Sequence, residues 1–139
     1  FNPSPIDASI QSLPLELVSL LVLNEIEGAA LAGTEDESLV LEGLRKRFPR
    51  CRILLTLGSR GCIYDDGTQR IQQKACSVEA VDTTAAGDTF TGYFVAADAA
   101  GLPPQERLQL ATQAAAIAVS RPGAAPSIPV MAEVKQFSL

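Results

Sequence analysis

Histidine is the most informative absence, because the 139 residues contain none. A chain without histidine cannot build a Ser-His-Asp or Cys-His nucleophile system, and it has no imidazole ligand for zinc. Proton transfer must then rely on carboxylates, lysine, cysteine, tyrosine or water. If the protein is an enzyme, we expect its general base to be an aspartate or a glutamate.

Positive charge and long apolar runs are also scarce. The chain has 11 Lys and Arg against 16 Asp and Glu, a formal net charge of -5. That balance excludes the broad basic surface that attracts nucleic acid or an anionic membrane. No run of about 18 apolar residues and no charged-then-apolar leader is present, so we expect neither a membrane span nor an export signal.

The cysteines are few and odd in number: Cys51, Cys62 and Cys76, with no pair at CxxC spacing. We therefore expect reduced thiols in a cytoplasmic protein. The length is sufficient for one compact domain. Because the chain begins with Phe1 in a proline-punctuated segment rather than with Met, we expect it to be a fragment.

Apolar and polar residues alternate between patterns typical of strands and of helices. Buried strands are predicted at Leu20–Leu23 and Ile53–Gly58, followed by a strand, a tight turn and a strand over residues 61–71. Helices are predicted over residues 25–31 with Gly33 as the stop, from the cap Thr34 to residue 48, over 87–100, over 103–119, and after Pro129. This order predicts an α/β fold.

The segment from Asp82 to Gly92 carries the strongest chemical signal. Small residues before a helix allow close backbone approach, and the first-turn amides of Ala86, Gly87 and Asp88 lack partners within the helix. Such a helix start binds a phosphate or oxyanion without a Walker-type lysine. Asp88 would repel that anion unless it faced an incoming hydroxyl, which is the place of a base for phosphoryl transfer. The alternative is that Asp88 only complements the helix dipole.

Two further segments admit a functional and an ordinary interpretation. A strand end followed by a glycine loop, Thr56–Gly61, is typical of nucleotide phosphate sites at the carboxyl edge of an α/β sheet, but also of ordinary tight turns. Within it, Arg60 could reach phosphate or be a solvated charge. Asn24 could end a strand, and Glu27 could be a solvated helix residue, without any further role.

The phrase from Asp82 to Asp88 resembles the C-terminal signature of the ribokinase (PfkB-type) carbohydrate kinase family, Asp-Thr-x-Ala-Ala/Gly-Gly-Asp. Further matches follow the family's order, at residues 2–5, at Asn24 with Glu27, at 56–61 and at 121–129. The resemblance implies a ribokinase-like sandwich of a mostly parallel sheet between helices. Residues 1–139 would be its C-terminal ATP-binding and catalytic part. The resemblance implies that the family's N-terminal half, with the lid and most sugar contacts, lies outside this chain.

The same resemblance implies roles for individual residues. Asp88 would be the base and would contact the sugar, and the backbone of Ala85, Ala86 and Gly87 would form the anion hole. ATP would contact Asn24, Thr56, Gly58, Ser59, Gly61, Gly87 and, at the adenine, Thr112. Glu27 would hold Mg²⁺ through water. A monovalent cation, commonly K⁺, would bind Asp82, the carbonyl of Thr84, Ala118, Arg121, Gly123 and Ser127.

The implied activity is transfer of the γ-phosphoryl of MgATP to a primary hydroxyl of a pentose or related sugar, ribose first. A nucleoside, pseudouridine or fructose kinase is the alternative within the family, and a nucleotide-binding module without turnover is the alternative outside catalysis. The resemblance also implies a homodimer through the absent N-terminal half. Tyr93 departs from the family, which usually has Ala or Gly there, so we expect helix packing or the wall of the site to differ.

Overall fold

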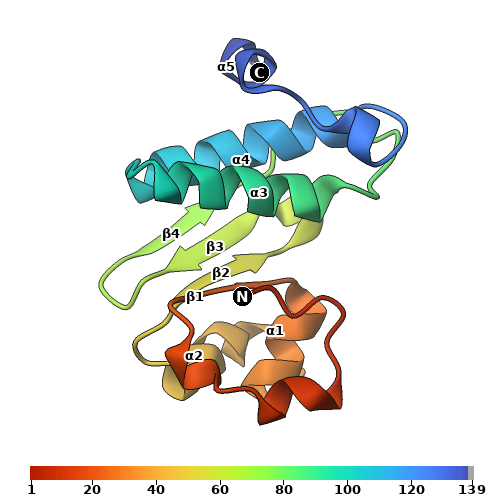
Figure 1. Cartoon of the computed structure of the whole chain (residues 1–139). Helices are drawn as coiled ribbons and strands as arrows, with labels where there is room; N and C mark the ends of the chain where they lie inside the picture. Colours follow the sequence, from red (N-terminus) through yellow and green to blue (C-terminus); the bar gives the residue numbers. More distant parts are fainter. Residues whose placement is uncertain (138–139) are drawn as a thin grey trace. The chain divides into compact units, whose positions relative to one another are not determined.

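The computed structural model describes residues 1–137. The chain divides into two compact units, Phe1–Gln72 and the part from Gln73 onward. Figure 1 follows the elements along the chain, which begins with two short 3₁₀ helices, η1 (Ala8–Ser12) and η2 (Leu15–Leu17).

A mixed sheet forms the centre of the first unit. Its strands are β1 (Leu20–Leu23), β2 (Arg52–Thr56), β3 (Cys62–Asp65) and β4 (Arg70–Gln73), in that order across the sheet. β1 runs parallel to β2, and β2 runs antiparallel to β3. All four residues of β1 are buried, which explains its continuous apolar sequence.

Helices α1 (Glu25–Ala32) and α2 (Glu37–Arg47) cover one face of β1 and β2 (Figure 1). The core between them contains Leu21, Leu23, Leu31, Val40, Leu44, Ile53 and Leu55. Gly28 allows the close approach, because a Cβ there would lie 2.8 Å from Leu55 Cδ1. The helix start, with Asn24 and Glu27, is thereby held at the carboxyl end of β1.

The predicted end of α1 is confirmed, and the predicted cap of α2 is wrong. α1 ends at Gly33, whose φ of 72° lies in the left-handed region that glycine tolerates. The cap of α2 is Asp36, not Thr34: Asp36 Oδ1 accepts from Ser38 N at 3.0 Å. Thr34 Oγ1 instead accepts from Asp36 N at 3.1 Å. A carboxylate at the cap also complements the helix dipole.

Three helices make up most of the second unit: α3 (Ala86–Ala99), α4 (Pro104–Val119) and the short α5 (Met131–Gln136). α3 packs along α4 (Figure 1). α5 packs on α4 through Val134, which contacts the cluster of Ala114 and Ile117. A 3₁₀ turn, η4 (Ala125–Ser127), lies in the loop between α4 and α5. Nowhere in residues 1–137 is a helix long and apolar enough to cross a membrane.

Candidate functional site

The N-terminus of α3 offers free backbone donors. Ala85 caps the helix without a side-chain hydrogen bond, and Ala86 N donates to Thr83 O at 3.2 Å. The amides of Gly87 and Asp88 make no hydrogen bond within residues 1–137. The sequence predicted free amides at Ala86, Gly87 and Asp88. The turn before the helix uses the amide of Ala86, so the free amides are those of Gly87 and Asp88. The remaining ones can bind an anion.

Open space and an unpaired carboxylate adjoin these donors. A Cβ built on Gly87 would meet no atom within 4 Å, so its backbone is accessible to a ligand. Asp88 is exposed, and its carboxylate has no hydrogen-bond or ion-pair partner among the described residues. An acceptor carboxylate thus stands at the same helix end as the free amides.

Asp82 connects the segment before α3 with the segment after α4. Its Oδ1 accepts from Thr84 N at 2.9 Å and from Thr84 Oγ1 at 2.6 Å, and its Oδ2 accepts from Gly123 N at 3.0 Å. The bonds from Thr84, and then the one from Gly123, lower the pKa of Asp82. The amides of Val81 and Asp82 both donate to Val119 O, at 2.7 and 3.1 Å.

The residues predicted to hold a monovalent cation are thereby gathered at one end of the second unit. Ala118 O accepts from Arg121 N at 3.2 Å, and the buried Ser127 donates its hydroxyl to Ala124 O at 2.7 Å. The Arg121 guanidinium pairs with Glu133 at 2.6 Å, which leaves the carbonyl as its group available to a cation. Carboxylate, hydroxyl and carbonyl oxygens are suitable ligands for such an ion.

A reciprocal capping box fixes Asn24 and Glu27 in the first unit. Asn24 Oδ1 accepts from Glu27 N, and Glu27 Oε2 accepts from Asn24 N, both at 2.9 Å. Glu27 is only 4% exposed, so it is not the solvated helix residue of the ordinary interpretation. Its Oε1 receives no hydrogen bond within residues 1–137, and this oxygen suits a metal-bound water.

The glycine loop after β2 has a closed backbone. Leu57 N donates to Gly61 O at 2.8 Å, and Gly61 N donates to Gly58 O at 3.1 Å, around the 3₁₀ turn η3 (Gly58–Arg60). Gly58 and Gly61 have φ values of 55° and 98°, which disfavour any residue with a side chain. Thr56 Oγ1 donates to Leu23 O at 3.2 Å, and Ser59 is exposed. The loop therefore adjoins the strand end that precedes Asn24.

Arg60 has partners that the sequence did not indicate. Its guanidinium pairs with Glu25 and Glu37, the first residues of α1 and α2. The ion pairs with Glu37 and Glu25 raise the pKa of Arg60, and Arg60 lowers the pKa of Glu37. Arg60 is thus an exposed surface charge, as one of the two interpretations expected, and its partners are the two acids at the helix starts. The acidic residues in the first turns of α1 and α2 were the sequence feature that could have indicated these ion pairs.

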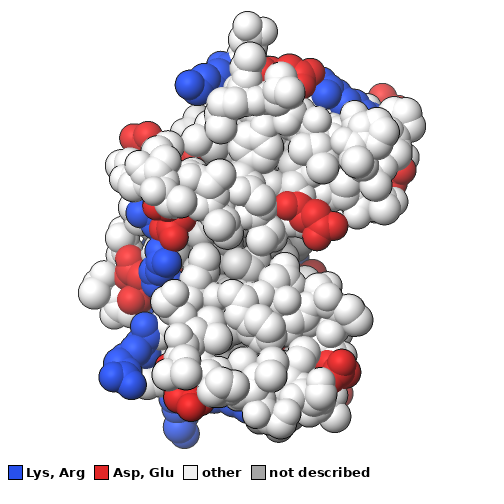
Figure 2. Space-filling view, in the orientation of Figure 1, with Lys and Arg blue, Asp and Glu red and all other residues white. Residues whose placement is uncertain are grey.

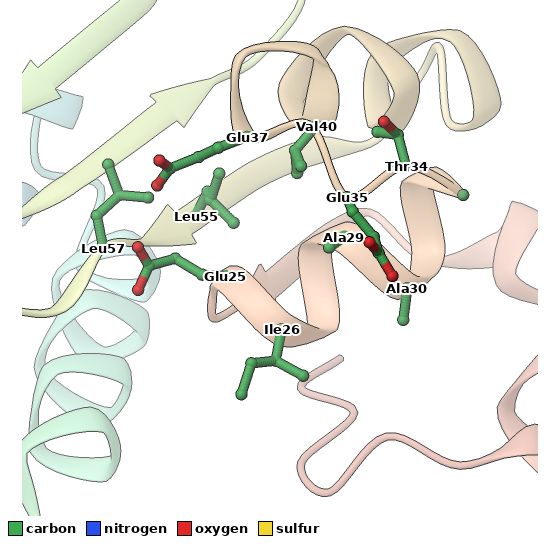
Figure 3. A pocket seen from close by; sticks show the side chains of 11 residues that line it. Glu25, Ile26, Ala29, Ala30, Thr34, Glu35, Glu37, Val40, Leu55 and Leu57 are labelled. Atoms are coloured by element: carbon green, nitrogen blue, oxygen red, sulfur yellow. The ribbon is translucent and has the colours of Figure 1, made fainter.

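A cavity of about 690 Å³ lies beside this ion-pair cluster within the first unit. Figure 3 shows Ile26, Leu55 and Leu57 on its apolar lining and the carboxylates of Glu25 and Glu37 at its edge. No sequence pattern predicted it, because residues from separate helices and from the end of β2 contribute to it.

Thr112 is the predicted adenine contact on α4. Its side chain is buried, with the residue 6% exposed, and Oγ1 has no hydrogen-bond partner in the described chain. A buried hydroxyl without a partner costs free energy, and because Oγ1 itself is buried, a ligand would reach it only after neighbouring side chains move. Thr89 on α3 shares this property.

Charged side chains of both signs lie on the surface. On the face shown in Figure 2, most of them lie toward the edges of the view, and its middle is largely uncharged. Within residues 1–137, no group of three Cys, Asp or Glu side chains is arranged to hold a metal ion.

Comparison with known proteins agrees with the α/β fold. A family model described as pfkB family carbohydrate kinase matches residues 1–131. A ribokinase of Schizosaccharomyces pombe is 39% identical over 96% of this chain and 44% of its own length. Among solved structures, a ribokinase of Cryptococcus neoformans in complex with ADP has a TM-score of 0.87 at 31% identity, covering 98% of this chain and 49% of that one. An Arabidopsis thaliana ribokinase complexed with ribose and ATP has a TM-score of 0.82 at 34% identity, over 89% and 43%.

The two units therefore form part of a ribokinase-like α/β fold with a mixed sheet. The chain belongs to the pfkB family of carbohydrate kinases. It spans less than half the length of each of these relatives.

Proposed function

We propose that residues 1–139 are the C-terminal ATP-binding and catalytic part of an ATP-dependent sugar kinase. The observation that carries this proposal is the start of α3, where the unpaired carboxylate of Asp88 stands beside the free amides of Gly87 and Asp88. The similarity to ribokinases, one solved with ribose and ATP, supports ribose as the acceptor. The product would be ribose 5-phosphate.

In the proposed reaction Asp88 orients a primary hydroxyl of the sugar and accepts its proton. The hydroxyl oxygen forms a bond to the γ-phosphorus as the bond from that phosphorus to the ADP oxygen breaks. During this transfer the amides of Gly87 and Asp88 donate hydrogen bonds to the oxygens of the phosphoryl group. Ala85 and Ala86 supply the rest of the backbone of the proposed anion hole. Because Ala86 N is already bonded to Thr83 O, it contributes less than its neighbours.

The nucleotide contacts are proposed separately for each unit. In the first unit they are Asn24, Thr56, Gly58, Ser59 and Gly61, and in the second they are Gly87 and Thr112. The free Oε1 of Glu27 would accept from a water of Mg²⁺. Mg²⁺, when bound, would neutralise charge on the β- and γ-phosphates. The contact of Thr112 with the adenine is proposed from the resemblance to the family.

A monovalent cation, K⁺ by preference, is proposed at Asp82, Thr84, Ala118, Arg121, Gly123 and Ser127. The hydrogen bond between Asp82 and Gly123 brings the two segments together. A cation there would add positive charge near the start of α3. We further propose a homodimer through the N-terminal half and a cytoplasmic location.

ADP release by the full-length protein tests the activity. Ribose, 2-deoxyribose, fructose, adenosine and pseudouridine are offered separately with MgATP and K⁺. We expect turnover with ribose to exceed turnover with the others. A different preferred acceptor would overturn the substrate, and no ADP release from a folded protein that binds ATP would favour the nucleotide-binding module.

A further inference from the structure

Tyr93 on α3 makes a contact that a small residue at this position could not. Its hydroxyl donates to Pro129 O at 2.7 Å, and its ring packs against the cluster of Ala114, Ile117 and Val134. Tyr93 is half-buried and Pro129 is buried. The tyrosine therefore attaches the segment before α5 to the same helix that begins beside Asp88.

The loop of residues 121–129 consequently has an attachment at each end. Near its start, Gly123 N donates to Asp82 Oδ2 at 3.0 Å, and at its end Pro129 O accepts from Tyr93. Between them, Ser127 N donates to Ala124 O at 3.1 Å, and Ile128 N donates to Ala125 O at 3.3 Å. Its other internal bond is from Ser127 Oγ to Ala124 O at 2.7 Å. Because all of these bonds are local to one 3₁₀ turn, the loop depends on its two ends for a fixed conformation.

The hydroxyl of Tyr93 is well placed to act as a permanent donor. A tyrosine phenol keeps its proton at neutral pH, and burial, followed by the nearby carboxylate of Glu133, raises the pKa of Tyr93 further. Glu133 is itself fixed by Arg121 and by Val130 N, which donates to Glu133 Oε2 at 2.8 Å. The Tyr93 hydroxyl, the Pro129 carbonyl that accepts from it and the nearby Glu133 carboxylate therefore form one contact region.

We propose that Tyr93 is a positioning residue that holds the loop of residues 122–129 in the conformation in which Gly123 meets Asp82 and Ser127 is buried. What the loop then does, binding a monovalent cation beside the anion hole, rests on the proposed function. The positioning itself is a property of this chain's own residues. It gives Tyr93 a role in cation affinity although it lies outside the predicted ligands.

Amide hydrogen exchange of the loop, followed in the full-length protein with and without K⁺, tests the proposal. Tyr93→Phe removes the hydroxyl and keeps the ring. Since one hydrogen bond contributes modestly, we expect the amides of Gly123, Ser127 and Ile128 to exchange about 3- to 10-fold faster than in the wild type. The K⁺ concentration that half-protects them should rise by a similar factor, with kcat at saturating K⁺ little changed.

Gln113→Ala is the matched control. Gln113 Nε2 donates to Phe137 O at 3.3 Å, so this variant removes another bond between a helix and the C-terminal segment without touching the loop. Exchange of the loop at wild-type rates in Tyr93→Phe, or equal acceleration in both variants, would overturn the proposal. A wild-type protein indifferent to K⁺ would contradict the cation site instead, and the exchange rates would still decide the role of Tyr93.

Discussion

At the scale of single residues, Gly87 and Asp88 are the residues proposed to carry the chemistry, and both make few contacts with the rest of the described chain. The backbone of Gly87 faces open space, and no group within residues 1–137 neutralises the carboxylate of Asp88. Complementing the helix dipole requires no side-chain partner either, so the variants below are what separate a ligand-binding role from the ordinary role of a helix-start acid.

Gly87→Ala separates the anion hole from folding. The methyl group meets no protein atom, and alanine is favoured in a helix by roughly 0.5–1 kcal/mol over glycine, so we expect the melting temperature to hold or rise. The methyl group would occupy the space of the phosphoryl, and kcat should fall by about tenfold or more. Gly92→Ala, also on α3 and also facing open space, should gain the same stability without losing turnover. Equal kcat in both variants would contradict the anion hole.

At the scale of elements, Arg45 joins the end of α2 to the sheet. Its Nη1 donates to Cys51 O at 2.7 Å and to Pro49 O at 3.2 Å, and its Nη2 donates to Asp65 O at 2.8 Å. Asp65 also pairs with Arg70 at 3.0 Å. Burial opposes ionisation of Asp65, but the Gly67 amide and both arginines lower its pKa. This network fixes where β2 begins and β3 ends.

Replacing Arg45 tests that network. Because Arg45→Met leaves buried carbonyls and the Asp65 carboxylate without their partner, we expect unfolding in urea to show a loss of about 2–4 kcal/mol. The neighbouring Lys46 is exposed, and Lys46→Met should change stability by less than about 0.5 kcal/mol. Similar losses in the two variants would show that the network does not stabilise the sheet.

The junction of α3 and α4 should depend on pH through Asp82. Its folded pKa lies below the unfolded value of about 3.9, so the ionised carboxylate stabilises the protein above that value. The contribution is lost as the pH falls through the lowered folded pKa. We expect the difference in melting temperature between the wild type and Asp82→Asn to be constant from about pH 5 to 7 and to shrink below about pH 4. A difference independent of pH would contradict this role of the charge.

At the scale of the whole molecule, local patterns predicted most elements. The apolar run at residues 20–23 predicted β1, and Gly33 predicted the end of α1. Both could be predicted because strand burial and helix termination depend on neighbouring residues. The cap of α2 was misplaced by competition between Thr34 and Asp36, both good capping residues.

Contacts between distant residues explain what the sequence could not predict. Arg60 meets Glu25 and Glu37 only after α1, α2 and the glycine loop have packed together. The contact of Tyr93 with Pro129 spans 36 positions. The sequence motif indicated where the candidate site lies. The hydrogen bonds within the site could be identified only from the folded structure.

The most direct test of the account is the separation of turnover from ATP binding in Asp88→Asn, measured in the full-length protein with MgATP and K⁺. Glu106→Gln, which removes an exposed first-turn acid from α4, controls for loss of a charge at a helix start. We predict that Asp88→Asn lowers kcat by about two to four orders of magnitude while the Kd for ATP changes little, and that Glu106→Gln retains both. Turnover close to wild type in Asp88→Asn would contradict the assignment of Asp88 as the base.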